Sequence, residues 1–227
     1  MRFGGVLRRV MRNYLPVIRR RGALLRQFTK KLGFVYFGSV DQHSDEHEMI
    51  RGLTVSTTHQ DSHYAVGAYD GYDISMVDRF DLIEQADGSF ASHSWLIMRF
   101  NLQNTSIPHF FLHPVGHGTG LDGPYQKYFT AFHYATKSNQ LLHDTHSVEF
   151  HGRYDLYTSA SHVPSVESSL SPDVSQTIAA RFWPHAIEVI DGALYVYITE
   201  HRLTEAMLGA TVQAGIWLAT ALDNESN

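Results

Sequence analysis

Three Asp-Gly pairs, each between runs of β-forming residues, constrain the fold of this 227-residue chain more than any other feature. They are Asp70-Gly71, Asp87-Gly88 and Asp191-Gly192. Asp-Gly favours the tight two-residue turn that joins neighbouring antiparallel strands. We therefore predict three hairpins, which pair residues 63–69 with 72–80, 80–85 with 89–103, and 186–190 with 193–200.

Two further segments show the alternation of a strand with one buried face. In the first, Leu96, Met98, Phe100 and Leu102 alternate with Trp95, Ile97, Arg99 and Asn101. In the second, Val148, Phe150, Tyr154 and Leu156 alternate with polar residues. Both segments are predicted to be half-buried strands of a sheet.

Helix signals follow in the C-terminal half. Ser171 and Pro172 are typical of a helix start, and the predicted helix continues to Trp183, before Pro184. Thr204 is a second cap candidate, ahead of an apolar helix over residues 205–222. Residues 115–145 and 158–172 are rich in small and polar residues and are predicted to be loops around one or two short elements. The pattern as a whole predicts an α+β domain over residues 34–227, with a mostly antiparallel sheet of six or seven strands.

Charge divides the chain at residue 33. Residues 1–33 hold ten of the eighteen Lys and Arg residues and none of the twenty-three Asp and Glu residues. The remainder therefore carries a formal charge of −15. A basic arm joined to an acidic body is typical of proteins that bind a polyanion, a membrane surface or nucleic acid.

The arm also has an apolar stripe. From Phe3 to Leu32, apolar residues recur at steps of three and four, which predicts an amphipathic helix that Pro16 kinks or divides. Such a helix can lie in the headgroup region of an anionic bilayer, whereas its cations alone would suit nucleic acid or a ribonucleoprotein. A third possibility is that the stripe packs on the body. The predicted membrane- or polyanion-binding residues are Arg8, Arg9, Arg12, Arg19, Arg20, Arg21, Arg26, Lys30 and Lys31.

The start of the chain lacks the uninterrupted apolar region and small-residue cleavage site of a secretory signal, so we expect a cytoplasmic protein that is peripheral to a membrane and not secreted. An organellar transit peptide is a weaker reading of the same arginines. The chain has no cysteine, which excludes disulfides and thiolate metal sites. All fifteen histidines follow residue 42, and their protonation could release the arm from the acidic body.

One histidine cluster is a metal candidate. His59, Asp61 and His63 occupy alternating positions, so on a regular strand their side chains would share one face and could begin a zinc or iron site. The spacing matches no strict metal motif, and no Gly-x-Ser-x-Gly nucleophile motif occurs. We therefore expect no cofactor, with a divalent metal as the alternative.

The segments KLGFVYFGSVD, IRGLT, AYDGYDISMVDR, PHFFLHP and EVIDGALYVYIT occur in this order along the chain. In this order the chain resembles a group of uncharacterised bacterial proteins in which a membrane-proximal segment precedes an α+β domain of unknown function. The resemblance implies a fold and membrane proximity, and it transfers no active-site residue.

These patterns favour a non-enzymatic module that attaches to an anionic membrane surface through its basic helix, with the body as an interaction domain. A metal-dependent hydrolase built on the His/Asp cluster and an RNA- or ribosome-associated factor are the alternatives. The patterns do not identify the protein partner of the body.

Overall fold

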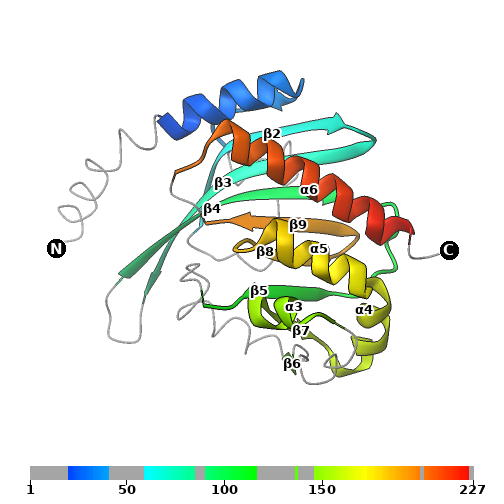
Figure 1. Cartoon of the computed structure of the whole chain (residues 1–227). Coiled ribbons are helices and arrows are strands. Elements are labelled where there is room, and N and C mark those ends of the chain that lie inside the picture. Colours follow the sequence, from blue (N-terminus) through cyan, green and yellow to red (C-terminus); the bar gives the residue numbers. More distant parts are fainter. Residues whose placement is uncertain are drawn as a thin grey trace.

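The computed structural model describes residues 20–40, 59–84, 90–116, 136–137, 146–199 and 202–224. Its central element is one antiparallel sheet with helices packed on one face (Figure 1). In chain order the strands are β1 (Val35–Tyr36), β2 (Gln60–Tyr69), β3 (Tyr72–Glu84), β4 (Phe90–Asn101), β5 (Phe110–Pro114), β6 (Thr136–Lys137), β7 (Tyr154–Thr158), β8 (Ala186–Ile190) and β9 (Ala193–Ile198).

The strands lie in the order β1-β2-β3-β4-β9-β8-β5-β7-β6, and all neighbours are antiparallel. The predicted α+β class and antiparallel sheet are confirmed. The described residues form nine strands rather than six or seven. Two of them, β1 and β6, have only two residues each, which is too short to produce a readable alternation in the sequence.

The predicted hairpins are present, and two of the Asp-Gly turns have the backbone that this pair favours. Asp70 and Gly71 have φ of 50° and 85°, and Asp191 and Gly192 have φ of 51° and 69°. Positive φ at both positions is the geometry whose twist matches that of the flanking strands. The Asp87-Gly88 turn lies outside the described residues, although Glu84 pairs with Phe90 on either side of it.

The described helices comprise residues 20–31, α3 (Val148–Arg153), α4 (Val163–Ser169), α5 (Pro172–Phe182) and α6 (Glu205–Asn224), with a short 3₁₀ turn, η1 (Ala160–His162). The two predicted helices correspond to α5 and α6. Thr204 caps α6, because its Oγ1 accepts a hydrogen bond from the Met207 N–H at 3.2 Å. η1 and α4 are the short elements expected between residues 158 and 172.

One strand prediction is wrong. Residues 148–153 form α3, and the predicted alternation continues as a strand only from Tyr154. The cause is local: the Ser147 side chain accepts a hydrogen bond from the Phe150 N–H at 3.2 Å and so caps a helix start. Val148 is consequently 90% exposed, whereas Phe150 is buried.

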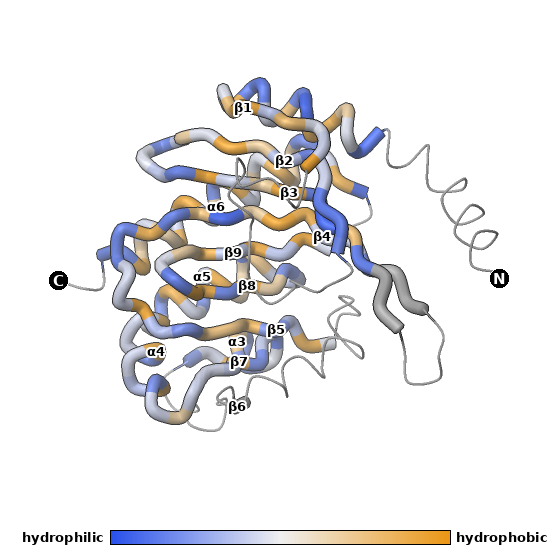
Figure 2. Tube along the Cα trace, turned by 180° about the vertical axis from the view of Figure 1, so that it is seen from behind, coloured by the Kyte–Doolittle hydropathy of each residue, from blue (hydrophilic) through white to orange (hydrophobic). Residues whose placement is uncertain are grey.

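The sheet is buried on both faces. The face under the helices forms the larger apolar core, which includes Leu96, Met98 and Phe100. The opposite face, seen from behind in Figure 2, holds a second cluster with Trp95 and Ile97. Both of these residues are fully buried, so β4 is not the half-buried strand that its alternation predicted. No described helix is long and apolar enough to cross a membrane.

Candidate functional site

The second half of the basic arm is docked on the body. The helix over residues 20–31 lies along the β1–β3 end of the sheet (Figure 1). Leu25 and Phe28 are buried in the same core as the strands, and Leu24 and Leu32 pack against that core. The apolar stripe of this half of the arm is therefore occupied by the body, as one of the sequence alternatives proposed. Arg8, Arg9, Arg12 and Arg19 lie outside the described residues.

A buried ion pair anchors the start of this helix. Arg21 Nε lies 2.9 Å and 2.8 Å from the two carboxylate oxygens of Asp78 in β3. Each side chain is 10% exposed. Burial raises the pKa of the Asp78 carboxyl, and the Arg21 guanidinium opposes that rise. Arg21 is thus committed to the body rather than available to an outside partner.

His63 lies beneath the same turn of the helix. A Cβ added at Gly22 would lie 2.5 Å from His63 Cε1, so the absence of a side chain at Gly22 lets the imidazole fit there. His63 Nδ1 lies 2.6 Å from the Tyr36 hydroxyl oxygen. Burial lowers the pKa of His63, Arg21 and Arg26 lower it further, and Asp78 opposes them.

The outer face of the helix presents cations. Arg20, Arg26, Lys30 and Lys31 are exposed. Arg26 lies over the Tyr36 ring at 5.2 Å from its centroid, and Lys31 Nζ lies 2.5 Å from Glu205 Oε1. Four of the five basic residues in this helix are therefore exposed, while Leu24, Leu25 and Phe28 face the core.

These contacts bear on the idea that histidine protonation releases the arm. Full burial of a Leu or Phe side chain stabilises by roughly 1.5–3 kcal/mol, so undocking Leu25 and Phe28 costs several kcal/mol. Protonation of one histidine contributes about 1.4 kcal/mol for each unit of pKa shift. His63 alone can loosen the first turn of the helix, but it does not supply the free energy to detach the whole element.

Two of the three predicted metal residues are engaged with other partners. The register of β2 shifts between Ser62 and Ala65, and His63 has φ of 55°, so the alternation that would align the three side chains is interrupted. Asp61 is paired with Arg79, and His63 is paired with Tyr36. Within the described ranges, no three His, Asp or Glu side chains are placed to share a metal ion. The metal site has no geometric support in this part of the chain.

A network of buried charges lies on the face away from the helices, and the sequence prediction missed it. Arg79 Nε and Nη2 each lie 2.8 Å from an oxygen of Asp61, and the two side chains are 0% and 2% exposed. Glu188 accepts a hydrogen bond from the Tyr197 hydroxyl at 2.5 Å and lies 2.8 Å from His109 Nε2. Burial, together with Glu188, raises the pKa of Tyr197 well above its usual value.

The available signal for this network was a charged residue inside an otherwise apolar strand. Glu188 interrupts the apolar run Ala186–Ile190, whereas Arg79 gave no such signal, because β3 also carries Asp73, Asp78 and Asp81. A charge at such a position is buried and must be paired. These groups are engaged with one another, so they hold the strands in register rather than offer a free acid or base.

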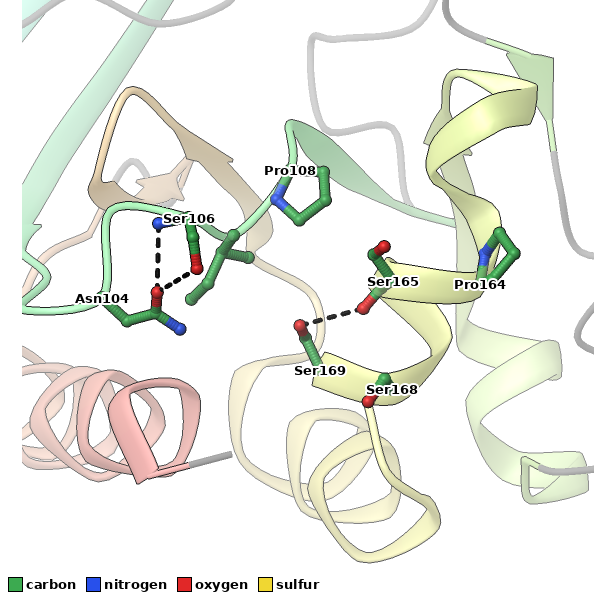
Figure 3. Close-up of a pocket in the computed structure, with 8 residues that line it drawn as sticks. Asn104, Ser106, Pro108, Pro164, Ser165, Ser168 and Ser169 are labelled. Carbon is green, nitrogen blue, oxygen red and sulfur yellow. Dashed lines mark hydrogen bonds between the residues drawn. The ribbon is translucent and has the colours of Figure 1, made fainter. Parts of the chain in front are cut away.

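A surface pocket of about 390 Å³ opens beside α4 (Figure 3). Its walls are amide, hydroxyl and apolar groups, from Asn104, Ser106, Ile107, Pro108, Pro164, Ser165, Ser168 and Ser169. Asn104 Oδ1 accepts hydrogen bonds from the Ser106 N–H at 3.0 Å and the Ser106 hydroxyl at 2.6 Å. The lining contains no ionisable side chain, so the pocket has no residue for general acid–base catalysis.

Comparisons with known proteins place the fold. No family model matches the chain, and no curated protein matches it. The fold is similar to that of the mycobacterial trehalose monomycolate transport factor A, TtfA, as seen in its crystal structure. The TM-score is 0.57, the sequence identity is 12%, and the match covers 90% of this chain and 93% of that chain. At this identity the likeness shows a shared fold, and the resemblance to an uncharacterised bacterial group stays a prediction.

Proposed function

We propose that this protein is a non-enzymatic interaction module that attaches to an anionic membrane surface through its basic helix. The observation that carries the proposal is the division of the helix over residues 20–31 into two sides. Its apolar side is buried against the sheet, and Arg20, Arg26, Lys30 and Lys31 face outward. Because the helix is docked on the sheet, its exposed cations are available to phosphate headgroups.

The docked helix determines the mode of contact. Because Leu25 and Phe28 are buried in the body, residues 20–31 cannot insert an apolar face into a bilayer. Their contribution is electrostatic, about 1 kcal/mol for each basic residue near an anionic surface, and salt weakens it. Any apolar insertion belongs to the predicted stripe of residues 3–18, which lies outside the described residues.

The body is proposed to act by binding rather than by catalysis. Its buried Asp61 and Glu188 are paired with Arg79 and His109, and the pocket beside α4 has no ionisable lining residue. TtfA, which shares the fold, is named as a transport factor, and this name is consistent with an interaction role for the fold. No observation on the described residues favours the metal-dependent hydrolase.

RNA or a ribonucleoprotein is a second candidate, and the docked helix favours it in one respect. The apolar stripe was the feature that distinguished lipid from nucleic acid in the sequence, and the body occupies this stripe over residues 24–32. The outward cations that remain would suit a phosphate backbone equally well. The apolar residues before residue 19 still favour lipid, so lipid remains the first proposal.

Vesicle flotation with competing RNA separates the two candidates. Removal of residues 1–33 is an unsuitable variant, because it also removes Leu25 and Phe28 from the core. The matched set is a chain that starts at residue 20, an Arg26→Gln/Lys30→Gln double variant, and an Arg181→Gln variant as a control at an exposed site on α5.

We expect the full chain to float with anionic vesicles and not with neutral ones, and we expect each loss of charge on the basic helix to weaken binding. Binding to RNA in preference to anionic vesicles would replace the membrane proposal with the nucleic-acid one. Absence of binding to either polyanion would remove both proposals.

A further inference from the structure

A buried histidine fastens α3 to α5. His146 lies just before the Ser147 cap of α3 and is 8% exposed, and its Nδ1 lies 2.8 Å from Ser175 Oγ in α5. The Ser175 hydroxyl donates its proton to the Pro172 carbonyl oxygen at 3.0 Å. The imidazole N–H is therefore the donor to Ser175, which assigns the neutral tautomer with hydrogen on Nδ1 and a lone pair on Nε2.

The second ring nitrogen, Nε2, is buried, and the imidazole lies beside two aromatic rings of α3. In the described part of the chain, His146 Nε2 has no hydrogen-bond partner. The ring centroids of Phe150 and His151 lie 5.3 Å and 6.1 Å from that of His146. The titratable groups that act on it are His151 on α3, which disfavours its charge, and Glu167 on α4, which favours it.

We propose that His146 is an acid-sensitive clasp: the neutral imidazole holds α3 against α5, and protonation at Nε2 opens this joint. A buried N–H cation without an acceptor is strongly disfavoured, so the protonated ring must move toward water. The element that it holds is small. α3 has six residues, of which Phe150 is buried, so the joint can open without loss of the sheet.

The direction of the pH effect follows from the neutral folded form. Burial lowers the pKa of His146 below its usual value of about 6.5, and His151 lowers it further. The contribution to stability is complete above about pH 6.5 and is lost as the pH falls toward and past the lowered pKa. The opening equilibrium constant of the joint rises by up to about tenfold for each pH unit between about pH 6.5 and the lowered pKa, and it levels off below that pKa.

His146 and Ser175 form a structural hydrogen bond rather than a catalytic pair. Ser175 has no exposed surface, and its hydroxyl proton is donated to a backbone carbonyl. A serine nucleophile must instead donate to its base and reach the substrate. The inference concerns the body alone and does not depend on membrane attachment.

Hydrogen exchange of the full chain between pH 8 and pH 5, corrected for the intrinsic pH dependence of exchange, tests the clasp. The variants are His146→Gln, which keeps a donor for Ser175 but does not titrate, and His162→Gln, which replaces an exposed histidine as a control. We expect amides of residues 150–153 in the wild type and in the His162→Gln variant to lose protection on acidification, by up to about thirtyfold, which is the most that the change from pH 6.5 to pH 5 allows. Amides of β3 and β4 should change much less.

The His146→Gln variant should lose this pH dependence. Acid-induced opening that persists in the variant, or its absence in the wild type, would overturn the proposal. Should the variant fail to fold, titration of the imidazole resonances of the wild type by NMR decides the matter. A His146 pKa below about 6.5, the usual value for a histidine, supports the clasp, and one at or above that value overturns the clasp.

Discussion

The helix over residues 20–31 and α6 pack against the same face of one sheet, yet their outer sides differ. α6 buries nine residues and carries no charged side chain from Ala206 to Leu222. The basic helix buries Leu25 and Phe28 on its inner side and exposes four cations on its outer side. α6 therefore contributes mainly to the core, whereas the basic helix contributes both to the core and to a positively charged surface. A basic amphipathic pattern alone does not say whether the apolar side faces lipid or the protein itself.

The largest expected effect comes from removing core contacts, and here the two helices should behave alike. Phe28→Ala in the basic helix and Leu218→Ala in α6 each create a cavity at a buried position. We expect each to lower the free energy of unfolding by about 2–5 kcal/mol in urea denaturation. A loss below about 1 kcal/mol for Phe28→Ala alone would show that the basic helix is not part of the core in solution.

The second largest effect is expected at the polar residues that attach each helix to the body. Here the two helices should lose different amounts of stability. Asp78→Ala leaves the buried Arg21 guanidinium without its partner, and we expect a loss of about 3 kcal/mol. In α6, Asp223 accepts hydrogen bonds from the Gln103 and Asn104 N–H groups at 2.9 Å and 2.8 Å, near the surface. Asp223→Ala should cost about 1–2 kcal/mol. Equal losses, measured by urea denaturation, would contradict the assignment of Arg21 and Asp78 as a buried anchor.

Acid should loosen the basic helix before it loosens α6. The pKa of His63, under Gly22, is lowered by burial, so its contribution to stability is present above about pH 6.5 and is lost as the pH falls below that value. The loss is about 1.4 kcal/mol for each unit of pKa shift. The raised pKa of Asp78 acts in the opposite direction at lower pH.

Hydrogen exchange at pH 8 and pH 5.5 measures this difference. Residues 21–25 should lose protection before the middle of α6 does, and His63→Gln should remove the difference between the two helices. Equal protection of both helices at pH 5.5 in the wild type would contradict the role of His63.

Much of the fold was predictable because its signals are local. Asp-Gly pairs specify their own turns, and Ser171, Pro172 and Thr204 mark helix starts within a few residues. The helix at 148–153 was not predicted, because two apolar residues at a spacing of two fit a strand equally well and the decision rests on the Ser147 cap.

The long-range features were harder to predict. The burial of both faces of β4, the bulge beside His63 and the pairs of Asp61 with Arg79 and of Glu188 with Tyr197 depend on which strands become neighbours. The basic helix was identified from its residues, but whether its stripe meets lipid or the sheet depends on tertiary packing, which the stripe itself does not encode.

The smallest effect on stability is expected at the outward cations. Arg26→Gln and Lys30→Gln alter exposed side chains, and each should change the free energy of unfolding by less than about 0.5 kcal/mol. These variants therefore remove charge from the proposed binding surface while the fold is retained. They therefore test the binding role of the exposed cations without altering the packing of the helix against the core.

Quantitative flotation of these two variants on anionic vesicles is the most direct test of the central claim. With Arg181→Gln as the control, Arg26→Gln and Lys30→Gln should each weaken partition about fivefold at low salt, which corresponds to about 1 kcal/mol for each charge. Arg181→Gln should leave partition unchanged. The claim would be contradicted if all three variants partitioned like the wild type while the chain that starts at residue 20 lost binding. That result would assign attachment to residues 1–19 alone.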